Sequence, residues 1–569
     1  MEKIIRKYAL QNAVFFNGKA NASSVVGKVM AENPDLRARA KEVIESANRI
    51  TGEVNQMLPE AQRKELEKIS PELLEKKEKS QREELPELKN AKSGKVVLRF
   101  SPEPNGYPHI GHAKAVLINE YYAKKYKAKM ILRFDDTNPV KEKKEYYKAI
   151  QDGLNWLGVK FDIVKNASDN METIYSFAEK LIRAGNAYVC TCDQEKIKRS
   201  RMSAKACRHR NKKPSGNLKD WKKMFSEFKQ NQAILRLKGD MESKNSVMRD
   251  PTLFRIIDAP HSLCGKKYRV YPTYDFSIVV EDRVDGITHA MRSKEYELRD
   301  ELYNTLFEMF GLKPPALVEF SRLDLEGTPV SKRYLKPLLE DGVIKSWDDP
   351  RLPTLAGLRR RGFVPEALRE FIISLGLTRS ESVLTWENME SFNRKALDSI
   401  ANRYYFVADP IKCVIENAPE KTIVKIPLHP DRPEKTKDYT INGKDLYVYV
   451  SRDDIENIKS VSKIRLMHLF NIYPGKITKS GITAKYAGNE KLDAKIQWVP
   501  KDAIKTKLLV PHKLFIGETI NKESLIEKEG LAEPAITKVK LDEKIQFERV
   551  GFARLDSKGE ELTFILAHR

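Results

Sequence analysis

The chain has 569 residues, and at ~100–200 residues per domain we expect about three to five domains. Its composition, 41% hydrophobic and 32% charged, excludes a disordered chain, and the lack of an apolar run of ~18 residues excludes a transmembrane helix. The 103 Lys and Arg residues against 80 Asp and Glu leave a net charge of +23, which favours a polyanionic partner, nucleic acid first, over a merely soluble basic surface. Five cysteines and an N-terminus without a signal-peptide core predict a reducing, cytoplasmic location.

Residues 1–93 are predicted to form a helical N-terminal region that ends in a charged linker. Ser23 and Ser24 are candidate helix caps, and apolar residues continue at helical spacing to Ile50. Residues 60–93 are rich in Glu, Lys and Gln with few apolar positions, which indicates a solvated helix or a tether.

The periodicity changes at residue 94. Val96–Phe100 and Met130–Phe134 are short apolar runs typical of buried strands, and they flank a Pro/Gly loop and a helical pattern over His109–Lys125. Strand, helix and strand in this order predict a doubly wound parallel sheet of α/β class, which binds ligands at the carboxyl ends of its strands. We assign its two halves to residues 94–185 and 266–330.

An insert at residues 186–265 interrupts this alternation and carries four of the five cysteines. Cys190 and Cys192 are followed, after 14 residues, by Cys207 and His209. Two such pairs provide four soft ligands, a set that suits tetrahedral zinc. Buried or incidental cysteines are the alternative interpretation.

Two further regions follow the sheet. Residues 331–404 are predicted to be mostly helical, with Phe363–Leu375 the clearest helix. Residues 405–569 are predicted to form an all-β barrel or sandwich, because short strand-like runs alternate with turn residues. These runs are Thr422–Leu428, Leu446–Val450, Ile482–Tyr486, Ile496–Val499, Ile545–Phe552 and Leu562–Leu566.

Two histidines follow the first predicted strand. His109 and His112 lie on the first turn of the next helix, where free N–H groups and the helix dipole favour anions. Their imidazoles can donate hydrogen bonds to phosphate oxygens, and Gly111 between them lets a flat ring approach the backbone. Two ordinary surface histidines are the alternative, which the strand, loop and helix context disfavours.

The segment PNGYPHIGHAK at 104–114 resembles the HIGH motif of class I aminoacyl-tRNA synthetases, and more narrowly that of the glutamyl and glutaminyl group. Five further segments resemble this family in the same order: RFDDTNP at 133–139, YPTYDF at 271–276, GITH at 286–289, WDDPRLPT at 347–354 and LRRRG at 358–362. The resemblance implies a Rossmann-type catalytic domain with an inserted acceptor-stem domain at 186–265. It also implies a helical stem-contact region at 331–404 and all-β anticodon-binding barrels at 405–569. The N-terminal region looks like that of archaeal glutamyl-tRNA synthetases.

The family's second signature is the KMSKS loop, which here reads PVSKR at 329–333. Pro329 replaces the first lysine, whereas Lys332 keeps the flexible ammonium that phosphates require. The resemblance implies catalytic roles for His109, His112 and Lys332. It implies an ATP site formed by Pro104, Asn105, Gly106, His109, Gly111, His112, Arg322, Leu323, Ser331, Lys332 and Arg333.

The amino-acid substrate needs partners for its ammonium, its carboxylate and its side chain. The family places Asp135 on the ammonium and Tyr274 against the substrate, and Arg99 at the end of the first strand can meet a carboxylate. Arg292 offers a guanidinium fork for a side-chain carboxylate, a geometry suited to glutamate; an exposed arginine is the alternative.

The resemblance therefore implies ATP- and Mg²⁺-dependent attachment of L-glutamate to tRNA(Glu), with structural Zn²⁺ in the insert. Charging of tRNA(Gln) stays open, and the N-terminal region is a candidate contact for other translation proteins. Three alternatives remain: a glutaminyl-tRNA synthetase, a small HxGH nucleotidyltransferase and a non-catalytic RNA-binding relative.

Overall fold

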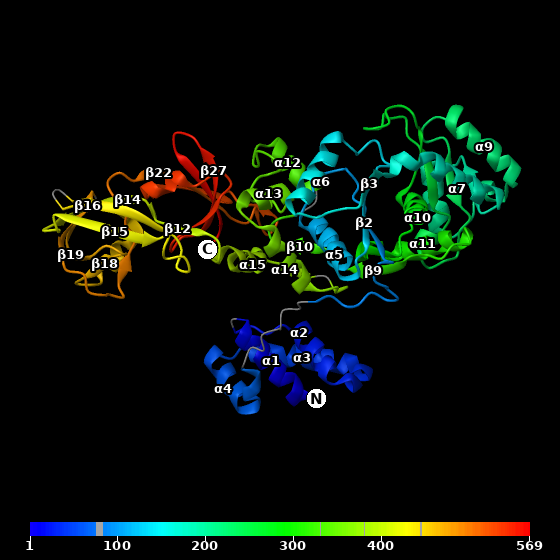
Figure 1. Ribbon diagram of the computed structural model, residues 1–569. Coiled ribbons are helices and arrows are strands. Elements are labelled where there is room, and N and C mark those ends of the chain that lie inside the picture. Colours follow the sequence, from blue (N-terminus) through cyan, green and yellow to red (C-terminus); the bar gives the residue numbers. More distant parts are fainter. Residues whose placement is uncertain (17, 75–83, 330–331, 381, 444–445, 479) are drawn as a thin grey trace. The chain divides into compact units, whose positions relative to one another are not determined.

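The computed structural model of the chain comprises two compact units, Met1–Gln81 and Arg82–Arg569 (Figure 1). It describes all residues except 17, 75–83, 330–331, 381, 444–445 and 479. The first unit is helical, as predicted. Its helices are α1 (Glu2–Phe15), α2 (Ala22–Glu32), α3 (Ala40–Asn55) and α4 (Pro59–Ile69), with 3-10 turns at Pro34–Arg39 and Pro71–Leu73.

The helices of the first unit bury one apolar stripe each around a core of their own, which includes Tyr8, Val25 and Ile50. The predicted caps of α2, Ser23 and Ser24, are wrong by two and three residues. Asn21 is the N-cap, because its side chain accepts the Ser24 N–H at 3.1 Å. Asn is at least as good a cap as Ser, and it stands one residue before the helix begins.

The second unit contains the predicted parallel sheet (Figure 1). β1 pairs in parallel with β2, β2 with β3, and β8 with β9. The N–H of Thr288 donates to the Val97 carbonyl at 3.1 Å, which places β8 beside β1 and gives the order β3-β2-β1-β8-β9. The elements are β1 (Val97–Phe100), α5 (Ile110–Tyr126), β2 (Lys129–Phe134), α6 (Lys144–Trp156), β3 (Ile163–Asn166), α7 (Met171–Arg183), α10 (Tyr274–Val284), β8 (His289–Ser293), α11 (Glu297–Met309) and β9 (Ala316–Phe320).

From β1 the chain continues to β2 on one side of the sheet centre, and from β8 it continues to β9 on the other side. The sheet therefore has its topological switch point between β1 and β8, where doubly wound folds bind ligands. Most residues of β1, β2 and β8 are buried, as a parallel sheet covered by helices requires.

The insert folds as a four-stranded antiparallel sheet between α7 and α10. Its strands are β4 (Ala187–Cys190), β5 (Ile234–Leu237), β6 (Thr252–Ile256) and β7 (Val270–Pro272), and its helices are α8 (Gln194–Met202) and α9 (Pro214–Ser226). The fourth strand lies beyond residue 265, the predicted end of the insert. The insert and α10 share one apolar core, which includes Trp221, Phe254 and Phe276.

Helices follow the catalytic sheet, as predicted. They are α12 (Lys332–Glu340), α13 (Leu355–Arg361), α14 (Pro365–Leu375) and α15 (Trp386–Asp398), with a short parallel strand pair, β10 (Leu323–Leu325) and β11 (Ser382–Leu384). The predicted helix Phe363–Leu375 begins two residues later, at Pro365, a residue favoured in the first turn of a helix.

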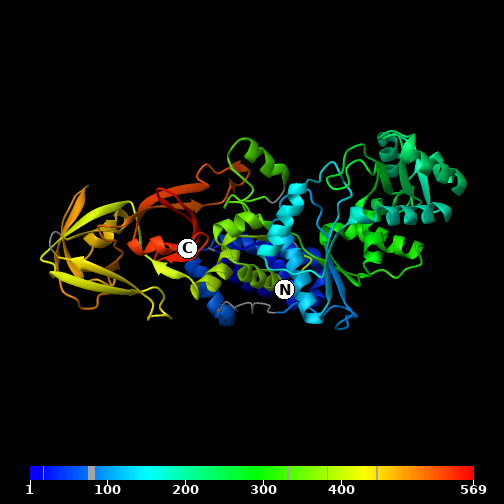
Figure 2. The same ribbon diagram turned by 45° about the horizontal axis from the view of Figure 1, so that its top comes forward.

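The C-terminal region contains two curved sheets (Figure 2). The seven-stranded sheet has the order β12-β26-β27-β28-β22-β25-β13, and its two edge strands are consecutive in the chain, so it is barrel-like. The six-stranded sheet has the order β17-β14-β20-β19-β18-β21, and a bridge between Tyr449 and Val499 links its two ends.

The strands of the first sheet are β12 (Asn402–Tyr404), β13 (Phe406–Ala408), β22 (Ile504–Pro511), β25 (Leu525–Ala532), β26 (Lys544–Phe547), β27 (Gly551–Lys558) and β28 (Leu562–His568). Those of the second are β14 (Pro410–Glu416), β17 (Tyr447–Ser451), β18 (Ile464–Leu466), β19 (Asn471–Ile477), β20 (Gly481–Tyr486) and β21 (Lys495–Ile496), with α16 (Ile455–Lys459) between β17 and β18. Two hairpins complete the region: β15 (Lys421–Pro427) with β16 (Thr436–Asn442), and β23 (Phe515–Ile516) with β24 (Thr519–Ile520).

Two predicted strands differ from the structure. Ile545–Phe552 is not one strand but the end of β26, a turn and the start of β27, because Arg549 adopts a left-handed conformation with φ 61°. The strand predicted at Ile496–Val499 ends at Ile496, after which the Trp498 indole donates to the Met467 carbonyl.

Candidate active site and metal cluster

A cavity of about 500 Å³ opens at the switch point of the parallel sheet. Most of the predicted site residues line it: Arg99, Asn105, Gly106, His109, Gly111, His112, Tyr274, Arg292, Arg322 and Leu323. Asp135 lines an adjoining cavity of about 470 Å³, and Tyr274 lines both.

Four predicted ATP-binding residues are not placed at the cavity. Pro104 is buried and is not among the lining residues, and its carbonyl accepts the Lys143 N–H at 3.3 Å. Ser331 lies outside the described residues, as do the side chains of Lys332 and Arg333. The roles of these four residues stay predictions.

The two histidines form a reciprocal cap at the start of α5. The Nδ1 atom of His109 accepts the Gly111 N–H at 3.1 Å, and the Nδ1 atom of His112 accepts the His109 N–H at 3.2 Å. An imidazole whose Nδ1 accepts carries its proton on Nε2. Burial lowers the pKa of His112 to about 4 and, together with the charges of His112 and Arg322, holds that of His109 well below its usual value. Both rings are therefore neutral Nε2–H donors at pH 7.

Gly111 is required by the histidine cap itself. A Cβ atom at this position would lie 2.8 Å from the Cε1 atom of His109, closer than such contacts allow. The ring that packs against this glycine is thus the imidazole of His109. Backbone bonds fix the same turn from outside: Ile110 N–H donates to Pro353, and Leu355 N–H donates to Pro108.

Lys114 is a residue of this site that sequence reasoning missed. Its side chain is buried in α5, and Nζ donates to the carbonyl (2.6 Å) and hydroxyl (3.0 Å) of Ser321. Burial lowers the pKa of Lys114 to about 8. The lysine joins the histidine helix to the loop of Arg322, which is 42% exposed and pairs with Glu295 at 2.9 Å. A lysine on the apolar face of a predicted helix was the available signal.

Buried ion pairs lie where the two cavities adjoin. Arg99 forms a pair with Asp282 at 3.2 Å, and Arg133 binds the Oδ1 atom of Asp135 at 3.2 Å. The second oxygen of Asp135, Oδ2, is buried without a hydrogen-bond partner among the described residues. Burial raises the pKa of Asp135 to about 6, against the charges of Arg133 and Arg99. An unpaired buried carboxylate oxygen at this place suits a substrate cation.

Arg292 lines the first of these cavities, with only 4% of its surface exposed. One guanidinium nitrogen donates to Asp300 Oδ1 at 2.6 Å, and the guanidinium carbon lies 4.4 Å from the centre of the Tyr303 ring. Its Nε–H is buried and has no acceptor among the described residues. The exposed-arginine interpretation is therefore wrong, and the guanidinium retains donor capacity for a ligand anion.

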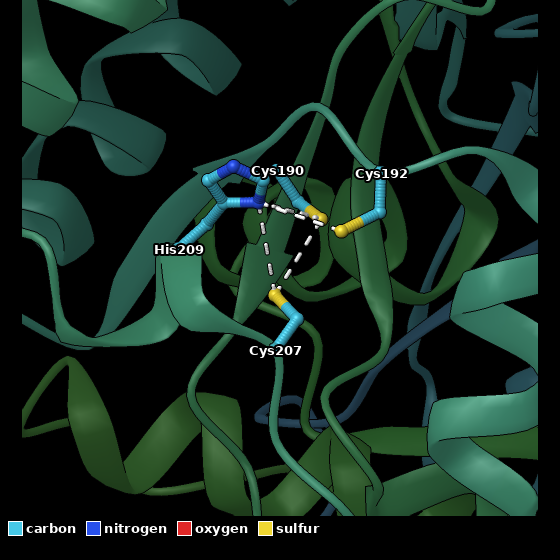
Figure 3. A group of neighbouring side chains, drawn as sticks. All are labelled: Cys190, Cys192, Cys207 and His209. Atoms are coloured by element: carbon cyan, nitrogen blue, oxygen red, sulfur yellow. Dashed lines mark hydrogen bonds between the residues drawn. The ribbon is translucent and has the colours of Figure 1, made fainter.

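The four predicted zinc ligands converge in the insert (Figure 3). Cys190 ends β4, Cys192 follows it, and Cys207 and His209 come from the turn 17–19 residues later; their ligand atoms all lie within 4.8 Å of one another. The Nδ1 atom of His209 lies 3.5 to 3.9 Å from the three sulfurs, and the two buried sulfurs are 3.7 Å apart. A tetrahedral zinc ion with Zn–S bonds of ~2.3 Å sets its ligand atoms about 3.5–3.8 Å apart, so the donor set fits this ion.

Three family models match successive segments of the chain. Residues 95–399 match the catalytic domain of the class I tRNA synthetases (E and Q), and residues 401–489 and 495–556 match their anti-codon binding domains. The chain belongs to this family. The match to the anti-codon binding domains argues against the small HxGH nucleotidyltransferase.

The chain is similar over nearly its full length to proteins named glutamate–tRNA ligase. It is 46% identical to that of Nitrosopumilus maritimus, with 98% of both chains covered, and 41% identical to that of Cenarchaeum symbiosum, with 97% covered. It is also 41% identical to the protein of Thermococcus kodakarensis over the whole of both chains. Among the described helices, none has the length and apolar character needed to cross a membrane.

Proposed function

We propose that the chain is a glutamate–tRNA ligase that activates L-glutamate with ATP and transfers it to the 3′ end of tRNA(Glu). The buried guanidinium of Arg292 carries this proposal. The family takes either glutamate or glutamine, and a buried guanidinium that lines the cavity and has an Nε–H without an acceptor among the described residues suits the side-chain carboxylate of glutamate. The amide of glutamine would place its NH₂ group against these donors.

The first step is formation of an adenylate. The α-carboxylate of glutamate attacks the α-phosphate of ATP, which enters as its Mg²⁺ complex, and pyrophosphate leaves. No protein nucleophile takes part, so the chain contributes position and charge stabilisation. The neutral Nε2–H groups of His109 and His112 donate to phosphate oxygens as negative charge builds on them, and Lys332 supplies a cation.

The amino acid is oriented by buried charges during this step. Its ammonium pairs with the free oxygen of Asp135, Tyr274 contacts it between the two cavities, and Arg99 lies near the α-carboxylate. In the second step a terminal ribose hydroxyl of the tRNA attacks the acyl carbon, and AMP leaves.

Zinc is proposed as a structural ion of the insert, held by Cys190, Cys192, Cys207 and His209. A bound ion would cross-link β4 to the following turn. The Thr191 hydroxyl lies 3.3 Å from Nε2 of His209, a contact that orients Nδ1 toward the sulfurs.

The tRNA is proposed to contact the insert near its acceptor end and residues 405–569 near its anticodon. The net charge of +23 supports such an extended phosphate contact. The unit Met1–Gln81 has its own core and is proposed to contact other translation proteins. A cytoplasmic location, expected from the few cysteines, is part of the proposal.

Charging by the purified chain tests the function. The assay contains ATP, Mg²⁺, radiolabelled glutamate or glutamine, and transcripts of tRNA(Glu) or tRNA(Gln). We expect glutamate on tRNA(Glu), and the second transcript decides whether tRNA(Gln) is also glutamylated. Direct charging of free glutamine onto tRNA(Gln) would overturn the assignment in favour of a glutaminyl-tRNA synthetase.

A further inference from the structure

Asp282, in α10, is a buried carboxylate with an unusual number of partners. Only 1% of its surface is exposed. Its Oδ1 atom accepts from Arg99 Nε at 3.2 Å and from Arg133 Nη2 at 2.9 Å, and its Oδ2 atom accepts from Arg99 Nη2 at 3.4 Å and from the Tyr303 hydroxyl at 2.9 Å. Two guanidinium groups and a phenol therefore meet on one carboxylate.

Each of these partners leads to a different substrate-binding residue. Arg99 is itself at the cavity. Arg133 donates from Nε to Asp135, the residue proposed for the ammonium. The ring of Tyr303 lies under the guanidinium of Arg292, the residue proposed for the side-chain carboxylate, at 4.4 Å. Asp282 is thus linked, directly or through one intervening side chain, to three groups that are proposed to bind different parts of the amino acid.

The charge on Asp282 is what orients these donors. Although burial raises the pKa of this carboxyl, the charges of Arg99 and Arg133 hold it below its usual value. A carboxylate fixes the planes of two guanidinium groups through charge-assisted bonds, whereas a neutral amide has an NH₂ group that would face one of them.

We propose that Asp282 is a positioning residue for amino-acid binding, which sets the orientation of Arg99 directly, of Asp135 through Arg133 and of Arg292 through Tyr303. This inference depends on the proposed function only for which amino acid is bound. Arg99 and Asp135 face groups that glutamate and glutamine share.

Asp285 provides a matched control. It lies three residues further along the same chain segment, accepts from Arg133 Nη1 at 2.7 Å and pairs with Lys165 at 2.9 Å. Its ion-pair partners among the described residues are Arg133 and Lys165, and they include neither Arg99 nor Tyr303. An Asp285→Asn variant removes a charge of the same ion network that contacts Arg133 but neither Arg99 nor Tyr303, so it leaves the routes to Arg99 and Arg292 intact.

The experiment compares aminoacylation by the full-length wild type, Asp282→Asn and Asp285→Asn, with tRNA present. We expect the KM for the amino acid to rise about tenfold or more in Asp282→Asn and less than about threefold in Asp285→Asn, with the KM for ATP within about twofold of wild type in both. Equal effects of the two variants on the amino-acid KM, or an equal rise in the KM for ATP, would mean that Asp282 acts only through general stability.

Because Asp282→Asn removes a buried charge, the folding of this variant is monitored by thermal melting. Tyr303→Phe provides a second variant. It deletes only the hydroxyl bound to Asp282 and keeps the ring under Arg292. We expect a rise of about threefold in the KM for glutamate, and an unchanged KM would overturn the route to Arg292. If the wild type charged glutamine instead of glutamate, the proposed function would be wrong. The comparison of Asp282→Asn with Asp285→Asn would then be made on the KM for glutamine.

Discussion

The active site has a proposed amino-acid end, where the two cavities adjoin, and a proposed phosphate end, at the two histidines, and these ends differ in their electrostatics. At the amino-acid end, Arg99, Asp135 and Arg292 are each at most 7% exposed, and every one belongs to an ion pair. At the phosphate end, His109 and His112 are neutral, and Arg322 is 42% exposed. Under the proposed function, a substrate whose charges are permanent would meet fixed charges, whereas an oxygen whose charge develops during the reaction would meet neutral donors that are already aligned.

We expect the largest effect from substitution of Arg292 at the amino-acid end. Replacing Arg292 by Cys removes about two charge-assisted bonds, worth about 1.5–3 kcal/mol each, so kcat/KM for glutamate should fall ~10²–10⁴-fold. The gap between glutamate and glutamine should narrow at the same time. Pyrophosphate exchange with each amino acid, with tRNA present, is the measurement.

Asp300→Asn is the matched control for this variant, because it removes the fixed partner of Arg292 and keeps the guanidinium. We expect a much smaller loss there. A glutamate preference that survives Arg292→Cys unchanged would mean that the side-chain carboxylate is read elsewhere.

The phosphate end should respond to the loss of a neutral donor. His112→Ala should lower adenylate formation ~10²–10³-fold while the Kd for tRNA stays close to wild type. His112→Gln restores an N–H group at a similar reach and should recover part of the loss. The same direction is expected for Lys332→Ala. Near-normal pyrophosphate exchange by His112→Ala would remove the histidine from its proposed role.

We expect the smallest effect on adenylate formation from changes to the metal cluster in the insert, which belongs to neither end of the active site. We expect about one zinc per chain in wild type by metal analysis, and a loss of that zinc in Cys207→Ser. Transfer to tRNA should fall more than adenylate formation. Cys264→Ser, outside the cluster, should keep the metal. Well under one zinc in wild type protein purified without chelators would contradict the zinc site.

The sequence predicts well what a local pattern records. The apolar runs of β1 and β2, the helix after His109 and the strand-end position of Asp135 all follow from spacing along a short segment. The spacing of the four zinc-ligand candidates also predicted their convergence. Barrel strands such as β17, β20 and β28 were predicted from short strand-like runs between turn residues, whereas β14, β22 and β25 were not, and a left-handed Arg549 divides one predicted run into two strands.

Contacts between residues that are distant in the chain cannot be predicted from a local pattern. Asp282 lies in the polar stretch EDRVDG and meets Arg99 across 183 positions, so no spacing links the two residues. Lys114 meets Ser321 across 207 positions. The orphan oxygen of Asp135 and the free Nε–H of Arg292 likewise arise from packing, which no single segment specifies.

The contrast between the two ends is tested most directly by the pH dependence of substrate binding. Burial raises the pKa of Asp135 to about 6, and the ammonium requires its ionised form, so protonation below pH 6 should weaken glutamate binding. Burial lowers the pKa of His112 to about 4, so the phosphate end should not titrate in this range. We therefore predict that the Kd for glutamate rises about tenfold from pH 7 to pH 5 while the Kd for ATP in excess Mg²⁺ changes little. Asp135→Asn should bind glutamate weakly at every pH. A glutamate Kd that stays constant to pH 5, or an ATP Kd that rises in parallel with it, would contradict the account.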